Sequence, residues 1–261
     1  MERRLYQVSN HKNPKNLMRK GKGFSFNLTF EPSEHKVRFT YPENWSSLPK
    51  KDRKEIANEI AYEAGPYLAF YATTWHEILT WFGVHFIAIE QEFNSAFSWE
   101  DSYSNLLGTR LAVKALQDDD HSFDEAMTLA INREMKKLGG QSGKTAKQAS
   151  ENMRGKWFTG NFIVDTKMRN FDIGLDGYVT PTLVPGTPEC GTEPVSIPVP
   201  NLEVLKKHGF TMTYEIKPNV LEQAKIFKVI EGKRVYPEKH YPVIMSSIKE
   251  KAVEKGYNFD E

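Results

Sequence analysis

The chain has 261 residues, of which 39% are hydrophobic and 12% aromatic, so it can bury a substantial core as a globular protein. Its 35 basic and 34 acidic residues nearly cancel, and this balance does not favour a nucleic acid, an anionic membrane or a strongly charged substrate as a partner. The single cysteine, Cys190, excludes an intramolecular disulfide, and its role is left open.

Targeting segments are not evident in these residues. No apolar run near Met1 is long enough for a signal peptide, so the residues by themselves predict a cytosolic protein. The longest apolar region, 67–89, is interrupted by histidines, a glutamate and threonines. We therefore interpret it as a buried core helix and not as a membrane span.

The first part of the chain predicts a β-hairpin followed by a helix. Residues 24–30 and 37–41 each alternate apolar and polar side chains, which is typical of strands with one apolar face, and 31–35 form the turn between them. A surface helix is predicted from 52 to 63, ending at Gly65.

A second, buried helix is predicted to begin at Pro66, because proline suits the first turn of a helix. Its apolar residues recur every three to four positions, as in an amphipathic helix. They are Leu68, Ala72, Trp75, Leu79 and Phe82.

Helix starts are also predicted at Ser98 and Ser122, because each is followed three residues later by an acidic residue, as in a capping box. The second of these helices is predicted to run to Leu138, and a further helix covers 145–153. With the buried helix, they predict a core of three to four helices within 51–157.

The last part of the chain differs in composition and is rich in proline. Residues 180–200 hold six of the 14 prolines, which excludes a regular helix or a central strand and predicts an arm that wraps the outside of the protein. A strand is predicted at 211–216, a short element of uncertain type at 220–228 and a terminal helix at 241–256.

These elements predict one α+β domain spanning 1–261. It consists of a hairpin region (1–50), the helical core (51–157) and a C-terminal region with the Pro-rich arm, a short strand and the terminal helix (158–261).

The candidate site begins with His76 and Glu77, an adjacent pair inside the buried helix, and continues with Glu100 at the start of a later helix. Several zinc hydrolases arrange ligands and base in this way, so His76 and Glu100 are candidate metal ligands and Glu77 a candidate general base. A two-histidine zinc helix places its second histidine four residues after the first, where this chain has Thr80.

Two nearby residues, Asp101 and Tyr103, are candidates for assisting catalysis. Asp101 is also well placed to cap its own helix. A closed or catalytic zinc site needs at least a third protein ligand, for which the candidates are Glu77, Asp101 and, with a poorer spacing, His85.

Three functions fit the same residues. The leading hypothesis is a zincin-like hydrolase that uses zinc, with a peptide or a cell-wall amide as the natural substrate. The alternative is a non-catalytic binding or scaffold protein in which His76, Glu77, Glu100 and Asp101 form a structural polar network. A metal-free acid/base enzyme built on His76 and a carboxylate is a third possibility.

A later charged cluster consists of Asp165, Arg169 and Asp172. Arg169 could pair with a carboxylate of the helical core, or the cluster could be a buried structural ion pair. No glycine-rich dinucleotide-binding pattern follows a predicted strand.

The chain resembles a bacterial family of unknown function, the DUF4056 family, over about 67–200. The resemblance rests on Trp75-His76-Glu77-Ile78 with Trp81-Phe82-Gly83, on Ser95 to Gly108, on Arg169-Asn170-Phe171-Asp172-Ile173-Gly174, on Glu189-Cys190-Gly191 and on Pro198-Val199-Pro200. Members of that family are longer at the N-terminus and carry an export signal, so the resemblance implies export to the bacterial envelope. This chain is expected to lack the extra segment. The resemblance implies no established activity.

Overall fold

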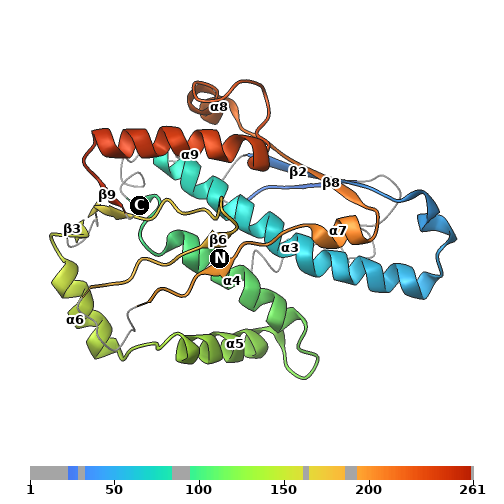
Figure 1. Cartoon of the computed structure of the whole chain (residues 1–261), viewed down its shortest axis with the longest axis horizontal. Coiled ribbons are helices and arrows are strands. Elements are labelled where there is room, and N and C mark those ends of the chain that lie inside the picture. The colour runs from blue at the N-terminus through green and yellow to red at the C-terminus, as the bar shows by residue number, and fades with distance from the viewer. Residues whose placement is uncertain (1–22, 29–32, 84–94, 161–164, 186–192, 260–261) are drawn as a thin grey trace. The chain divides into compact units, whose positions relative to one another are not determined.

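The computed structural model describes residues 23–28, 33–83, 95–160, 165–185 and 193–259, and the following statements concern these residues (Figure 1). They form long helices and small, mostly antiparallel sheets, which confirms the predicted α+β class. None of the helices in this part of the chain combines the length and the apolar character needed to cross a membrane.

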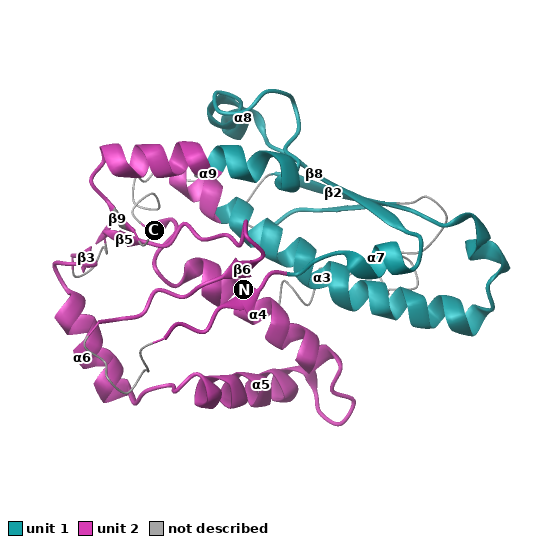
Figure 2. Ribbon diagram, viewed as in Figure 1, with its two compact units in different colours: residues 1–76, 200–244 teal, residues 77–199, 245–261 magenta. Residues whose placement is uncertain are grey.

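The chain divides into two compact units, each built from two segments (Figure 2). Unit 1 consists of Met1–His76 and Pro200–Ile244, and unit 2 of Glu77–Val199 and Met245–Glu261. Helix α3 (Lys50–Trp81) and helix α9 (Pro237–Glu254) each contribute residues to both units. The single domain expected from the sequence stays a prediction.

Unit 1 contains a three-stranded antiparallel sheet in the order β1-β2-β8. Its strands are β1 (Phe24–Phe26), β2 (Glu34–Thr40) and β8 (Thr211–Lys217). Along β2 the side chains of His35, Val37 and Phe39 are buried, while Arg38 and Thr40 are exposed, as expected of a strand with one apolar face. The predicted hairpin and the predicted strand at 211–216 are thus confirmed, and they belong to the same sheet. The bounds of the hairpin are corrected, because β1 ends at Phe26 and β2 already begins at Glu34, within the predicted turn.

Short helices complete unit 1. They are η1 (Glu43–Ser47), α7 (Glu203–Lys207) and α8 (Val220–Ile226). The ring of Phe210 lies 5.2 Å from that of Tyr41 and 5.1 Å from that of Trp45, which joins the residues before β8 to those after β2. The element predicted at 220–228, whose type was left open, is the helix α8.

Helix α3 corrects one prediction, because it runs unbroken through Gly65 and Pro66, where the sequence predicted one helix to end and another to begin. A proline inside a helix costs about 3 kcal/mol, since it removes a hydrogen bond and crowds the preceding turn. Tyr67, Leu68 and Phe70 are buried directly after Pro66, and their packing offsets that cost.

Among the described residues, the first segment of unit 2 contains three helices after α3, which are α4 (Asp101–Leu116), α5 (Phe123–Lys137) and α6 (Gly143–Met153). Helix α5 begins with the predicted capping box, in which Ser122 and Glu125 satisfy each other's backbone N–H groups. Helices α4 and α5 share an apolar core. Its buried residues are Leu111, Ala115, Ala126, Met127 and Ala130.

The start of α4 is a second correction. The helix was predicted to begin at Ser98 as its N-cap, but the turn at Ser98 precedes the helix, whose first residue is Asp101. The terminal helix also begins earlier than predicted, because Pro237 takes the first helical position of α9.

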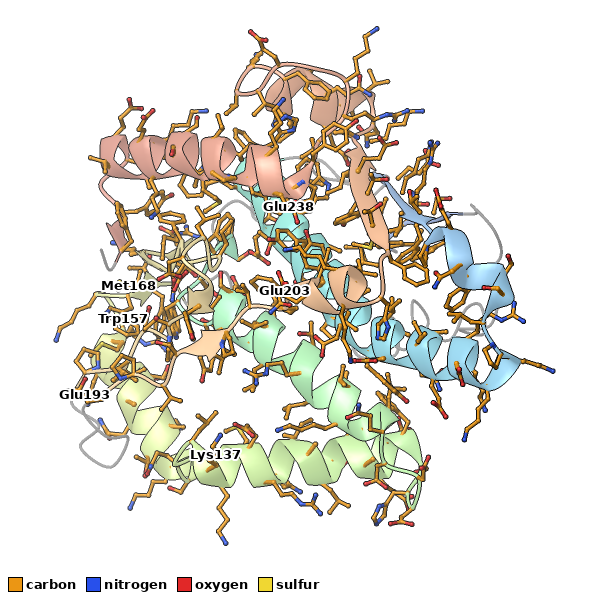
Figure 3. The ribbon with its side chains drawn as sticks, turned by 45° about the vertical axis from the view of Figure 1, so that its right-hand side comes forward. Lys137, Trp157, Met168, Glu193, Glu203 and Glu238 are labelled. Atoms are coloured by element: carbon orange, nitrogen blue, oxygen red, sulfur yellow. The ribbon has the colours of Figure 1, made fainter. Side chains whose placement is uncertain are left out.

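Besides its helices, the described part of unit 2 contains six strands of two residues each. They are β3 (Phe158–Thr159), β4 (Asp165–Thr166), β5 (Met168–Arg169), β6 (Tyr178–Val179), β7 (Ile197–Pro198) and β9 (Asn258–Phe259). Trp157 and Met168, both labelled in Figure 3, belong to one buried cluster with Met153 and Phe158. Strand β7, in the predicted Pro-rich arm, pairs with β6, which comes just before the arm, and both strands contact α4.

Candidate functional site

The predicted pair of adjacent residues lies in the last turns of α3. His76 is half-buried and is the last residue of the first segment of unit 1, whereas Glu77 is the first residue of unit 2 and only 8% exposed. Successive helical residues point about 100° apart, so the two side chains face different surroundings. The contacts of Glu77 define the centre of the site described below.

Glu77 holds the backbone of Phe97, which lies in a turn before α4. The backbone N–H of Phe97 donates to Oε2 of Glu77 at 2.9 Å, and the carbonyl of Phe97 accepts from the N–H of Asn170 at 3.0 Å. Phe97 is completely buried and has a φ of 54°, a left-handed conformation that costs a bulky residue about 1–3 kcal/mol. Among the described residues it is the only one other than glycine with a positive φ.

Asp101 acts on the next residue of the same turn. Its Oδ2 accepts from the backbone N–H of Ser98 at 2.7 Å, while its own N–H donates to the carbonyl of Ser98 at 3.0 Å. The two bonds close the turn that leads into α4. This geometry is that of a helix-start contact, which was one of the two interpretations of Asp101.

Arg169 approaches the same turn from strand β5. Its side chain is completely buried, and its Nη1 donates to the carbonyl of Ala96. The guanidinium carbon lies 4.6 Å from the centre of the Tyr257 ring, a cation–π distance. Within the described residues, Nε and Nη2 have no hydrogen-bond partner, and no ion pair joins Arg169 to a carboxylate.

Burial lowers the pKa of Arg169, because the charged guanidinium is removed from water, and the neighbouring Tyr257, Asp165 and Asp101 oppose this effect. The nearby carboxylates therefore act on Arg169 through space, whereas its hydrogen bond goes to a backbone carbonyl. The predicted pairing of Arg169 with a carboxylate is replaced, within the described residues, by this backbone contact.

Asn170 and Asp172 fix the irregular backbone after β5. The side-chain amide of Asn170 donates to the carbonyl of Thr180 at 3.0 Å, and the carboxylate of Asp172 accepts from the N–H groups of Gly174 at 2.8 Å and Thr180 at 2.7 Å. Gly174 has a φ of 73°, and a Cβ atom there would lie 2.1 Å from Val199. This position therefore requires glycine.

These contacts bring three stretches of the sequence to one place, which we call the Phe97 cluster: Glu77, Phe97, Ser98, Arg169 and Asn170. Aromatic rings pack around it, with the ring of Phe171 at 5.5 Å from that of Phe97 and 5.5 Å from that of Trp81. The cluster is thus a buried polar centre surrounded by aromatic rings, in which the side chains of Glu77 and Arg169 and the backbone N–H of Asn170 bond to the backbone of the turn at Phe97.

The other two predicted residues lie elsewhere on α4 and its approach. Glu100 is exposed as a residue. Its pKa is raised because the surrounding protein partly removes its carboxyl group from water and because the Asp101 carboxylate is adjacent. The hydroxyl of Tyr103 donates to the carbonyl of Val195 at 2.9 Å, and partial burial followed by the charge of Glu134 raises its pKa. Tyr103 thus fastens the Pro-rich arm to α4.

A metal site needs several donor side chains close together. In the part of the chain that the structure describes, no three side chains of histidine, cysteine, aspartate or glutamate lie close enough to hold a metal ion. His85, a predicted third ligand, and Cys190 lie outside the described residues. The predicted zinc site, with His76 and Glu100 as ligands, remains a prediction.

Unit 1 contains a buried polar group of its own. The indole N–H of Trp75 donates to Oγ of Ser33 at 2.9 Å, and the hydroxyl of Ser33 donates to Glu222 at 2.6 Å. His35 contacts the hydroxyl of Tyr214 through Nδ1 at 2.7 Å. Sequence reasoning did not find these contacts, because they join residues far apart in the chain.

Phe97 and Asn170 were also missed as members of the site. The run Asn170-Phe171-Asp172-Ile173-Gly174 has short polar residues followed by glycine, which is typical of turns held by side-chain bonds to the backbone. That signal could have identified Asn170. Nothing about a phenylalanine indicates a left-handed backbone, so Phe97 could not have been found in this way.

Comparison with known proteins agrees with the resemblance noted in the sequence. The family model described as a protein of unknown function, DUF4056, matches residues 12–182, which include the residues of the Phe97 cluster. No curated protein and no solved structure gives a significant match. The chain therefore belongs to the DUF4056 family.

Proposed function

We propose that this protein is a non-catalytic binding or scaffold protein, in which the acidic residues of the motifs hold a turn in place instead of performing chemistry. The observation that supports this proposal is the pair of bonds from the consecutive N–H groups of Phe97 and Ser98 to Glu77 and Asp101. A buried polar network of this kind specifies one backbone conformation.

The role of Glu77 carries most of the argument. A general base must present an acceptor lone pair to the proton it removes, within about 2.6–3.2 Å. Glu77 is buried, and its Oε2 lies 2.9 Å from the backbone nitrogen of Phe97. Such a position suits a structural acceptor better than a base that must reach a substrate.

A metal-dependent hydrolase of zincin-like type is the second proposal. It is favoured by Glu100, an exposed carboxylate whose pKa is raised, since perturbed carboxylates are frequent at reactive sites. In this proposal His76 and Glu100 bind zinc, Glu77 is the general base, and a peptide or cell-wall amide is the substrate.

Elemental analysis distinguishes the two proposals. The purified protein, His76→Ala and Glu100→Ala are dialysed against metal-free buffer and measured before and after zinc addition. The scaffold proposal expects no stoichiometric zinc in the folded wild-type protein. Near-stoichiometric zinc that both variants lose, with unchanged thermal unfolding, would overturn it and support the hydrolase.

The variant Glu77→Gln provides the matching control, because glutamine keeps an oxygen that accepts the N–H of Phe97 but is not a base. Under the scaffold proposal it unfolds at nearly the wild-type temperature. Under the hydrolase proposal it binds zinc like the wild type but is inactive towards any amide substrate that the wild type cleaves.

A further inference from the structure

Helix α8, in unit 1, carries the two most exposed large hydrophobic side chains of the described part of the chain. Val220 is 80% exposed and Leu221 is 69% exposed, and they are adjacent at the start of the helix. Single exposed aliphatic residues are common, but two neighbours at the start of a projecting element form a patch that needs an explanation.

The inner side of α8 is firmly anchored. Glu222 and Ile226 are completely buried, and Oε2 of Glu222 accepts from the hydroxyl of Ser33 and from the backbone N–H of Asn219, each at 2.6 Å. Asn219 and Glu222 also form a capping box. Helix α8 therefore has a fixed orientation, which directs Val220 and Leu221 outward. Figure 1 shows α8 at the outer edge of unit 1, beyond the end of β8.

The exposed face of α8 is basic as well as apolar. Ala224 and Lys225 are exposed, and helical spacing places them on the same side as Val220 and Leu221. Lys228, in the turn after the helix, is exposed as well. Lys217, just before the helix, is also exposed. The acidic residue within 217–228 is Glu222, which faces inward. Within 217–228, the exposed side chains of this outer face therefore combine aliphatic residues with lysines.

We propose that the outer face of α8 docks on an anionic lipid surface. Aliphatic side chains insert between lipid headgroups, while lysines place their stems along the interface and their ammonium groups near phosphates. The complementary charge of an anionic headgroup layer suits the lysines, and the anchored helix can insert the exposed Val220 and Leu221 without rearranging. The contact is reversible, because two aliphatic residues are a small anchor compared with an acyl chain.

Co-sedimentation of the full chain with lipid vesicles tests this proposal. One set of vesicles contains phosphatidylcholine alone, and the other contains phosphatidylcholine mixed with phosphatidylglycerol. We expect binding to the anionic vesicles to be about tenfold tighter than to the neutral ones and to weaken as salt is added. Equal binding to both kinds, or none to the anionic vesicles, would overturn the proposal.

Paired variants separate the apolar and the charged contributions. Val220→Ser/Leu221→Ser and Lys225→Gln/Lys228→Gln should each weaken binding to anionic vesicles about tenfold. Two matched controls change similar exposed residues elsewhere, Val253→Ser on α9 and Lys136→Gln/Lys137→Gln on α5, and should bind like the wild type.

Polyglutamate, as a mimic of an acidic protein, tests whether the outer face of α8 binds such a protein instead of a lipid surface. If polyglutamate binds as tightly as the anionic vesicles, and the change of Val220 and Leu221 to serine has no effect on either, the lysines serve an acidic protein and the lipid proposal fails. Loss of vesicle binding in the serine variant, with polyglutamate binding weaker than vesicle binding, would support the lipid surface.

Discussion

The buried group around Trp75 and His35 in unit 1 is joined by hydrogen bonds between side chains, whereas the Phe97 cluster in unit 2 is joined mainly by hydrogen bonds from side chains to the backbone. Trp75, Ser33 and Glu222 form one chain of side-chain bonds, and His35 pairs with Tyr214. In unit 2, by contrast, the side chains of the Phe97 cluster contact N–H and carbonyl groups of the turn at Phe97 and of the segment that follows β5.

The difference determines how replaceable each group is. When both partners of a buried hydrogen bond are side chains, replacing both by apolar groups of similar shape can be nearly neutral. When one partner is a backbone group, it stays behind after the side chain is removed and keeps its full desolvation cost. We therefore expect a side-chain pair such as His35 and Tyr214 in unit 1 to tolerate paired apolar replacement, and the Phe97 cluster in unit 2 to depend on each side chain.

The largest expected effect is at Glu77. Glu77→Ala leaves the buried N–H of Phe97 without its acceptor and leaves a cavity, so the free energy of unfolding should fall by about 3 kcal/mol. Glu77→Gln retains an oxygen acceptor, and its loss should be about 1 kcal/mol. Denaturant unfolding measures both variants. Equal losses would mean that the charge of Glu77, and not its bond to Phe97, is what matters.

The next largest expected effect is the pH dependence that His35 gives to the free energy of unfolding. Burial lowers the pKa of His35 from 6.5 to about 3, because its ring is completely shielded from water. The folded state keeps His35 neutral, while the unfolded state binds a proton below pH 6.5. The contribution of neutral His35 to the free energy of unfolding is therefore fully present above pH 6.5. It is lost as the pH falls towards 3, at up to about 1.4 kcal/mol per pH unit.

The measurement compares wild type with His35→Phe between neutral pH and about pH 4.5. The wild type should lose about 2.5 kcal/mol more of its free energy of unfolding over this interval than the variant, which has no proton to bind at this position. Parallel curves for the two proteins would show that another group causes the acid sensitivity.

The smallest effect is the coupling between His35 and Tyr214. Either His35→Phe or Tyr214→Phe alone leaves one buried polar group without its partner, whereas the double variant removes both. At neutral pH, the double variant should lose about 1 kcal/mol less than the sum of the two single variants. Strict additivity in this double-mutant cycle would contradict the proposed difference between the side-chain pairs of unit 1 and the Phe97 cluster.

Local signals in the sequence predicted the local parts of the fold. The capping box that starts α5 lies within four consecutive residues, Ser122 to Glu125, and was correctly identified. The β1–β2 hairpin was also predicted, because its two strands are close in the chain. The place of β8 beside β2 was not, since that pairing depends on residues far apart in the sequence.

Tertiary packing overrode local signals in α3. Gly65 and Pro66 are a reasonable helix end and helix start, yet the helix continues through them because the residues on either side are buried. The sequence identified Glu77, Asp101 and Arg169 as residues of interest by their type. Their contacts with the backbone could not be predicted, because every residue has the N–H and carbonyl groups that serve as partners.

The crossing of α3 and α9 from one unit into the other has a consequence for dissecting the protein. The chain passes between the units after His76, after Val199 and after Ile244, and the first and last of these points lie inside helices. Neither unit can therefore be expressed as one continuous fragment. A cut at either helical crossing would separate backbone N–H groups from the carbonyl groups one turn earlier that they bond to. During synthesis, unit 1 cannot be completed until the ribosome has made residue 244, long after its first segment and most of unit 2 have emerged.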